Sequence, residues 1–131
     1  MEKLKIGLIG LGQRGAAYGM TDGSIGLLGN ILNNSDVLVT ALCDGYEERI
    51  KFAAEKVMAA GQKKPLETKD YNEVLSSEVD AVIVCTSWAS HVEVALAAME
   101  KGIAVAIEVG GTHNLGDMQK LVETYERTKT P

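Results

Sequence analysis

An apolar run that passes directly into three spaced glycines constrains this chain more than any other feature. The run Lys5–Ile9 continues through Gly10, Gly12 and Gly15 in the pattern G-x-G-x-x-G. In a parallel α/β sheet, Gly10 would allow the tight turn, Gly12 the close approach of a phosphate, and Gly15 the packing of helix on strand. The pattern predicts a central strand whose carboxyl end holds a pyrophosphate at a helix N-terminus.

The same loop places Gln13 and Arg14 beside the predicted pyrophosphate. The Arg14 guanidinium either lies along a phosphate or is solvated, and the sequence leaves both readings open. For the motif as a whole, the alternative is a turn that binds no ligand, because glycine interrupts many strand-to-helix connections.

Four further apolar segments alternate with helical patterns. Strands are predicted at 37–43, 65–68, 81–85 and 103–107, and helices at 46–60, 70–75, 90–101 and from about 114. Strands separated by helices are parallel and joined by right-handed crossovers. We therefore expect one α/β domain over 1–131, a doubly wound parallel sheet of about five strands in the order 3-2-1-4-5, with helices on both faces.

For three of the predicted helices, the sequence supports more detailed expectations. The first should begin near Ala16 and break within the glycine-rich segment 19–30, leaving a short second helix through Ile31 and Leu32, because glycine costs a helix interior about 1 kcal/mol relative to alanine. Ser90 and Glu93 have the spacing of a capping box. The last helix should bury a stripe at helical spacing, made of Met118, Leu121, Val122 and Tyr125.

Composition excludes several classes of partner. The formal net charge of −5 argues against nucleic acid, which is bound by positive surfaces. No apolar stretch approaches the ~20 residues that cross a bilayer, and no leader pattern follows Met1, so we expect a cytoplasmic protein without a membrane partner. Cys43 and Cys85 end separate predicted strands and should be free thiols, and neither has a second metal ligand nearby in the sequence.

Asp44 ends the second predicted strand, where a carboxylate could accept both hydrogen bonds from an adenosine ribose. A carboxylate at this place repels a 2′-phosphate, so NAD is favoured over NADP. The alternative is that Asp44 caps the helix that follows.

Polar and aromatic residues also follow the fourth and fifth strands. Thr86, Ser87, Trp88 and His91 follow the fourth, and Glu108 ends the fifth. Trp88 could wall the nicotinamide or substrate pocket, or cover a core edge. His91 is either catalytic or a buried hydrogen-bonding side chain, Glu108 is a second catalytic candidate, and His113 is interpreted as a solvated loop residue.

These positions together resemble the cofactor domain of the glucose-fructose oxidoreductase, inositol dehydrogenase and rhizopine-catabolism (Gfo/Idh/MocA) family. The resemblance spans essentially the whole chain and rests on Gly10–Gly15, Cys43-Asp44, Val79–Ile83, the loop to His91, Ala97–Gly102 and Glu108. It implies an NAD(P)-binding domain followed by a second domain, not contained in these residues, that carries much of the substrate site and the oligomer contacts. The whole protein is therefore expected to be a homo-oligomer, and this chain alone to be inactive.

One departure bears on the chemistry. Where the family usually has Glu-Lys-Pro, this chain has Glu108-Val109-Gly110, so the lysine that assists proton transfer beside the nicotinamide is missing. Together with Trp88–His91, this turn is similar to a family branch of NAD-dependent glycoside hydrolases. The resemblance thus implies an NAD-dependent oxidoreductase that acts on a sugar, cyclitol or related polyol. The alternatives are such a glycosidase and a non-enzymatic dinucleotide-sensing module.

Overall fold

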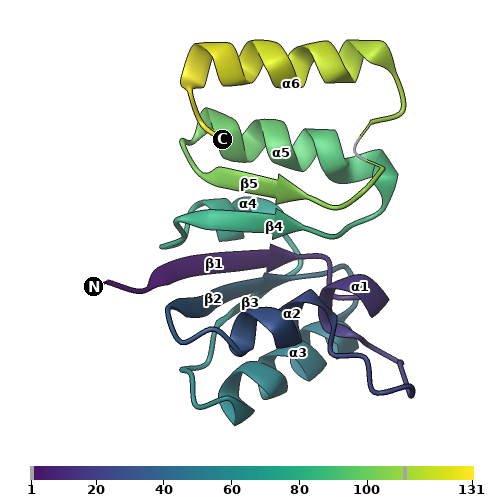
Figure 1. The fold of residues 1–131 in the computed structure, drawn as a ribbon, viewed down its shortest axis with the longest axis vertical. Helices are drawn as coiled ribbons and strands as arrows, with labels where there is room; N and C mark the ends of the chain where they lie inside the picture. Colours follow the sequence, from purple (N-terminus) through teal and green to yellow (C-terminus); the bar gives the residue numbers. More distant parts are fainter. Residues whose placement is uncertain (1, 111) are drawn as a thin grey trace.

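The computed structural model describes residues 2–110 and 112–131, which form a parallel sheet flanked by helices (Figure 1). Its strands are β1 (Leu4–Ile9), β2 (Val37–Cys43), β3 (Leu66–Thr68), β4 (Ala81–Val84) and β5 (Ala104–Ile107). Every paired neighbour is parallel, and the order is β3-β2-β1-β4-β5. The predicted fold class and strand order are confirmed.

The first five helices cover the two faces of this sheet, and the last one packs against the fifth. The helices are α1 (Gln13–Ala16), α2 (Gly26–Leu32), α3 (Glu47–Ala59), α4 (Tyr71–Leu75), α5 (His91–Glu100) and α6 (Leu115–Thr128), with a short 3-10 turn, η1, at Trp88–Ser90. One core joins β1 and β2 to α1, α2 and α3, and a second joins β1, β2 and β4 to α4 and α5. The central strand serves both: Leu8 lies in the first core and Ile9 in the second, each at most 2% exposed.

The first helix differs from its prediction. It begins at Gln13 and ends after one turn at Ala16, because Ala17 adopts a left-handed conformation with φ 56°. A loop follows, and then the separate helix α2, as the glycine-rich segment predicts. The glycine loop is therefore followed by a single helical turn.

The apolar stripe predicted to be buried along α6 is largely exposed. Met118, Val122 and Tyr125 are 53%, 57% and 49% exposed, Leu121 is half-buried, and only Thr124 is buried. The predicted helix is confirmed, but its apolar side is not packed against the sheet as those of the other helices are. It packs beside α5 beyond the edge strand β5 (Figure 1), so no strand in the described part of the chain lies beneath its apolar side.

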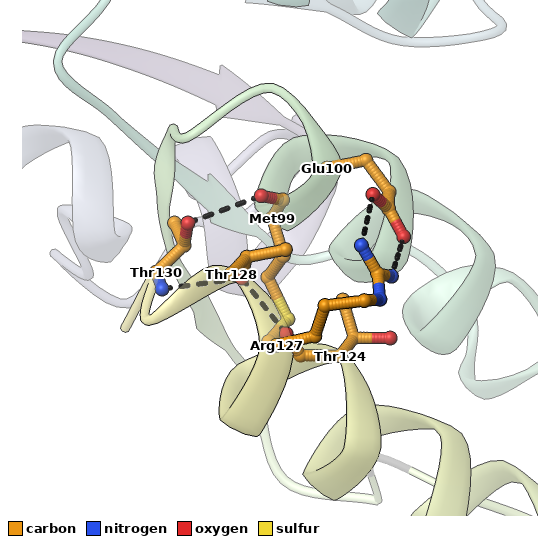
Figure 2. A network of polar contacts seen from close by, with 6 residues as sticks. All are labelled: Met99, Glu100, Thr124, Arg127, Thr128 and Thr130. Atoms are coloured by element: carbon orange, nitrogen blue, oxygen red, sulfur yellow. Dashed lines mark hydrogen bonds and ion pairs between the residues drawn. The ribbon is translucent and has the colours of Figure 1, made fainter.

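Polar contacts hold the end of α6 on α5 (Figure 2). Arg127 pairs with Glu100 through its two terminal guanidinium nitrogens, and Nη1 donates to Glu100 Oε2 at 3.0 Å. The Thr130 hydroxyl donates to the Met99 carbonyl at 3.1 Å. The Pro131 carbonyl then accepts from Val105 N–H at 2.9 Å, which brings the chain alongside β5.

A side chain completes the outer edge of β2. The strand β3 pairs only with residues 41–43 of β2. Ahead of this pairing, Val39 N–H donates to Gln62 Oε1 at 2.8 Å, and Gln62 Nε2 donates to the Val37 carbonyl at 3.1 Å. The Gln62 carboxamide thus takes the place of a neighbouring strand.

Replacing Gln62 by alanine should lower the free energy of unfolding by about 1–2 kcal/mol, because two backbone groups of β2 lose their partners. Urea denaturation measures the change. Lys63→Ala, at the exposed neighbour, is the control and should stay within about 0.5 kcal/mol of the parent. Equal stability of the two variants would contradict this role.

Candidate functional site

The carboxyl ends of β1, β2 and β4 surround a cavity of about 510 Å³. Its lining includes Gly10, Gly12, Asp44, Arg49, Thr86 and Ser87. A groove of about 530 Å³ reaches the beginning of β2 instead, but ligands of doubly wound sheets bind beyond the carboxyl ends of the strands, where the order reverses. The candidate site is therefore the cavity at the end of β1.

Two glycines of the loop are required by the protein's own packing. Gly10 has φ +96°, and a β-carbon there would overlap the Cys85 carbonyl group. A β-carbon at Gly15 would collide with the Gly10 carbonyl oxygen. At Gly12, the nearest neighbour of a β-carbon would be Arg49 Nη1 at 3.5 Å, an ordinary contact, so Gly12 leaves space on the cavity side.

Asp44 ties the end of β2 to the glycine loop. Its side chain is 7% exposed. The Oδ2 atom accepts from Leu11 N–H at 2.8 Å, and the Oδ1 atom accepts from Tyr46 N–H at 2.9 Å. The N-cap position of α3 is Tyr46, where no side chain forms a capping hydrogen bond. The Asp44 carboxylate thus braces the loop and faces the cavity, and does not occupy the N-cap position.

Sequence reasoning missed Arg49. Its Nη1 lies 3.8 Å from Asp44 Oδ2, and its guanidinium carbon lies 4.5 Å from the Tyr46 ring centre and 5.8 Å from that of Tyr18. The available signal was its place in the first turn of α3, where the helix dipole disfavours a cation unless a nearby anion compensates. Asp44 is that anion.

An ion pair joins the loop to the far side of the site. Arg14 Nε donates to Glu108 Oε1 at 2.6 Å, although the residues are 94 positions apart. Glu108 N–H donates to the Val84 carbonyl at 3.0 Å, which extends the β4–β5 ladder by one residue. Arg14 is therefore neither fully solvated nor free, and its hydrogen bond holds the pKa of Glu108 below the ordinary carboxyl value.

His91 is buried beneath the loop that follows β4. It is 1% exposed, and its Nε2 lies 2.8 Å from the Thr86 carbonyl oxygen. A carbonyl only accepts, so Nε2 carries the proton, while Nδ1 has no partner within the described residues. This geometry favours the buried hydrogen-bonding alternative and makes His91 a positioning residue for Thr86.

The predicted capping box of α5 is absent. No side chain caps this helix through Ser90. The Ser90 hydroxyl instead lies 2.8 Å from Thr86 Oγ1 and 3.2 Å from the Ser87 carbonyl oxygen. The 3-10 turn before α5 redirects Ser90 to the loop, so Ser90 and His91 both fix the backbone at 86–87.

Trp88 and His113 follow β4 and β5, respectively, and are not among the residues that line the cavity. The indole is 59% exposed and its ring centre is 6.4 Å from that of His113. His113 is exposed, as the sequence predicts. Trp88 is not covering the core, since most of its surface faces solvent.

The two cysteines are free. Their strands flank β1, and burial raises the pKa of Cys43 to about 12 and that of Cys85 to about 11. Among residues 2–110 and 112–131, no group of three or more His, Cys, Asp or Glu could hold a metal ion. Over the same residues, no helix is long and apolar enough to span a membrane.

Replacing Arg14 by glutamine should raise the pKa of Glu108 toward its ordinary value. The lowered pKa means that the ion pair is complete at neutral pH and is lost as the pH falls through that value. A titration of the Glu108 carboxyl carbon by NMR measures the shift. Arg127→Gln, which removes the partner of Glu100 instead, should leave Glu108 unchanged, and an unaltered Glu108 in the Arg14 variant would refute the pairing.

Comparisons with known proteins identify the relatives of this fold. Residues 4–130 match the family model described as oxidoreductase family, NAD-binding Rossmann fold. A glycosyl hydrolase family 109 protein from Streptomyces niveus is 36% identical over 96% of this chain and 25% of its own length. The relative from Porphyromonas gingivalis with the same family name is 31% identical over 98% of this chain and 27% of its own.

Solved structures show the same architecture. A dehydrogenase from Chromobacterium violaceum superposes with a TM-score of 0.78 at 25% identity, covering 99% of this chain and 34% of that one. The WlbA dehydrogenase from Bordetella pertussis, solved with NADH and UDP-GlcNAcA, gives a TM-score of 0.76 at 20% identity, covering 98% and 36%. The chain thus spans about a quarter to a third of these proteins. It belongs to the Gfo/Idh/MocA oxidoreductase family, as its NAD(P)-binding Rossmann domain.

Proposed function

We propose that this chain holds NAD for an oxidoreductase that transfers hydride to and from a sugar, cyclitol or related polyol. The observation that carries the proposal is the hydrogen bond from Leu11 N–H to Asp44, which lines the cavity together with Gly10 and Gly12. It places a carboxylate that can bind a ribose beside a glycine turn that can bind a pyrophosphate.

The residues present fit such a cofactor. The first amide groups of α1 lack helical partners and can donate to phosphate oxygens, and Gly12 leaves room for this approach. Thr86 and Ser87 line the β4 side of the cavity and would hold the nicotinamide end. When bound, the nicotinamide supplies the hydride acceptor. The protein's part is to orient the ring and exclude water.

Asp44 supports NAD over NADP. Both oxygens already accept backbone N–H groups, yet a carboxylate oxygen has a second lone pair for a ribose hydroxyl. A 2′-phosphate would meet the same carboxylate and be repelled. Arg49 is held by Asp44 and the Tyr46 ring, so its charge is partly engaged.

Replacing Asp44 by asparagine should weaken NAD binding about tenfold or more, since a hydrogen bond to a charged group contributes roughly 1.5–3 kcal/mol. It should also narrow the preference for NAD over NADP. Calorimetric titration with both cofactors measures the two effects, and circular dichroism checks the fold. Asp36→Asn, just before the opposite end of β2, is the matched control. If both variants bind NAD equally well, Asp44 does not contact the cofactor.

We infer that the acid and base groups for catalysis come mainly from parts of the protein outside these residues. Glu108 is engaged by Arg14, and His91 is buried against Thr86, so neither is presented to a substrate as these residues stand. Residues 1–131 alone should therefore not turn over a sugar. We propose that the oligomer contacts also lie in the parts of the protein outside these residues.

An NAD-dependent glycosidase is the second candidate, favoured by the glycosyl hydrolase name of relatives at 36% and 31% identity. Incubating the full-length protein, which includes the parts outside these residues, with aryl glycosides and no added NAD separates the candidates. Net NADH formed from a free sugar and added NAD supports the dehydrogenase. Aglycone release without net NADH supports the glycosidase. Dinucleotide binding with neither reaction leaves a sensing module.

A further inference from the structure

The glycine turn is followed by a very short helix whose direction must be fixed by contacts from other elements. The helix α1 contains four residues, Gln13–Ala16, and a single helical turn has little stability of its own. It ends because Ala17 adopts φ 56°, a left-handed conformation that a non-glycine residue keeps only where neighbouring contacts enforce it. The orientation of α1 therefore depends on what holds the chain around Ala17.

Lys56, on α3, supplies such a contact at the end of α1. Its Nζ donates to the carbonyl oxygen of Ala16 at 3.1 Å, between residues 40 positions apart. The last carbonyl groups of a helix have no partners within it, and the helix dipole is negative at this end, so a cation is a favourable partner. Lys56 thus closes the end of α1 opposite Gly12, the residue that lines the cavity.

An aromatic pair lies beside the Lys56 side chain. The Nζ atom is 4.6 Å from the ring centre of Phe52, one turn earlier on α3. The Phe52 ring meets the ring of Tyr18 edge-on, with 5.3 Å between the ring centres and 85° between the planes. Since Tyr18 directly follows the left-handed residue and Ala16 directly precedes it, α3 contacts the chain on both sides of that residue.

The beginning of α2 also packs against the end of α1. A β-carbon at Gly26, which has φ +65°, would lie 2.7 Å from Ala17 N and 3.0 Å from the Ala16 carbonyl carbon. This contact is steric and limits the space available to the end of α1. The hydrogen bond from Lys56 is directional, and it sets where the Ala16 carbonyl points.

We propose that Lys56 is a positioning residue for the glycine turn and for the pyrophosphate bound there. By holding the carboxyl end of α1, it keeps the free N–H groups at the amino end of that helix directed at the phosphates. Lys56 does not line the cavity, so it acts through α1 and does not touch the cofactor. The proposal rests on the proposed function, in which this turn binds the pyrophosphate of NAD.

ADP and adenosine test this role, because they differ only in the diphosphate. The full-length protein, freed of bound nucleotide, is titrated with each by calorimetry. Lys56→Met keeps an apolar stem beside Phe52 and removes the ammonium. It should weaken ADP binding about tenfold, as expected for the loss of a charge-assisted hydrogen bond, and leave adenosine binding unchanged. Lys56→Arg should restore most of the ADP affinity, because it keeps a charged donor.

Lys51→Met is the matched control. Lys51 lies on the same helix and pairs with Glu47 at 2.8 Å, so this change removes the same charge without altering a contact to α1. It should leave the affinities for both ligands unchanged.

Hydrogen–deuterium exchange of the unliganded protein measures the positioning directly. In the parent, Ala16 N–H donates to the Gly12 carbonyl and Ala17 N–H to the Gln13 carbonyl, both at 3.0 Å. The peptide that contains these amides should exchange about tenfold faster in Lys56→Met, and at the parent rate in Lys51→Met. Unchanged exchange in Lys56→Met would contradict the role of Lys56.

The titrations keep this proposal apart from the proposed function. A parent protein that binds ADP no more tightly than adenosine overturns the pyrophosphate site, and the role of Lys56 with it. A preference for ADP that Lys56→Met retains in full overturns the role of Lys56 alone. Equal losses of ADP and adenosine affinity would make Lys56 a general structural residue, which also overturns the proposal.

Discussion

The glycine turn at the end of β1 depends on how closely three strand ends surround it. Gly10 N–H donates to the Cys43 carbonyl at 2.8 Å, and Cys85 N–H donates to the Ile9 carbonyl at 2.7 Å. The backbone of Gly10 fits beside Cys85 only without a β-carbon. The site is thus a consequence of the sheet's own hydrogen bonding, extended one residue beyond the strands.

Side-chain hydrogen bonds connect the glycine turn to the neighbouring strand ends. Asp44 fixes the loop from the β2 side, and Arg14 reaches Glu108 on the β5 side. Beneath the β4 loop, His91 and Ser90 hold Thr86. The Asp44 carboxylate accepts two backbone N–H groups and lies beside the Arg49 guanidinium, and the Glu108 carboxylate is paired with Arg14.

Sequence reasoning succeeded where a local pattern and a buried face coincide. The order of the strands and the break before α2 follow from the alternation of apolar runs and from glycine's cost within a helix. The prediction that α6 buries its apolar stripe was wrong. The helical spacing of apolar residues identifies an amphipathic helix but does not identify what packs against it. Arg49 was missed because its partners, Asp44 and two tyrosine rings, meet it only in the folded chain.

A doubly wound sheet with a glycine turn and a carboxylate at neighbouring strand ends follows from the sequence alone, because hydrophobic period and glycine spacing are local properties. The contacts of those groups are set by the folded chain. It paired Arg14 with Glu108 across 94 positions, buried His91, and set the exposed Trp88 against Gly110. Such contacts depend on the distances between segments that are remote in the chain. The crossover connections of the sheet establish these distances, and a local sequence pattern does not predict them.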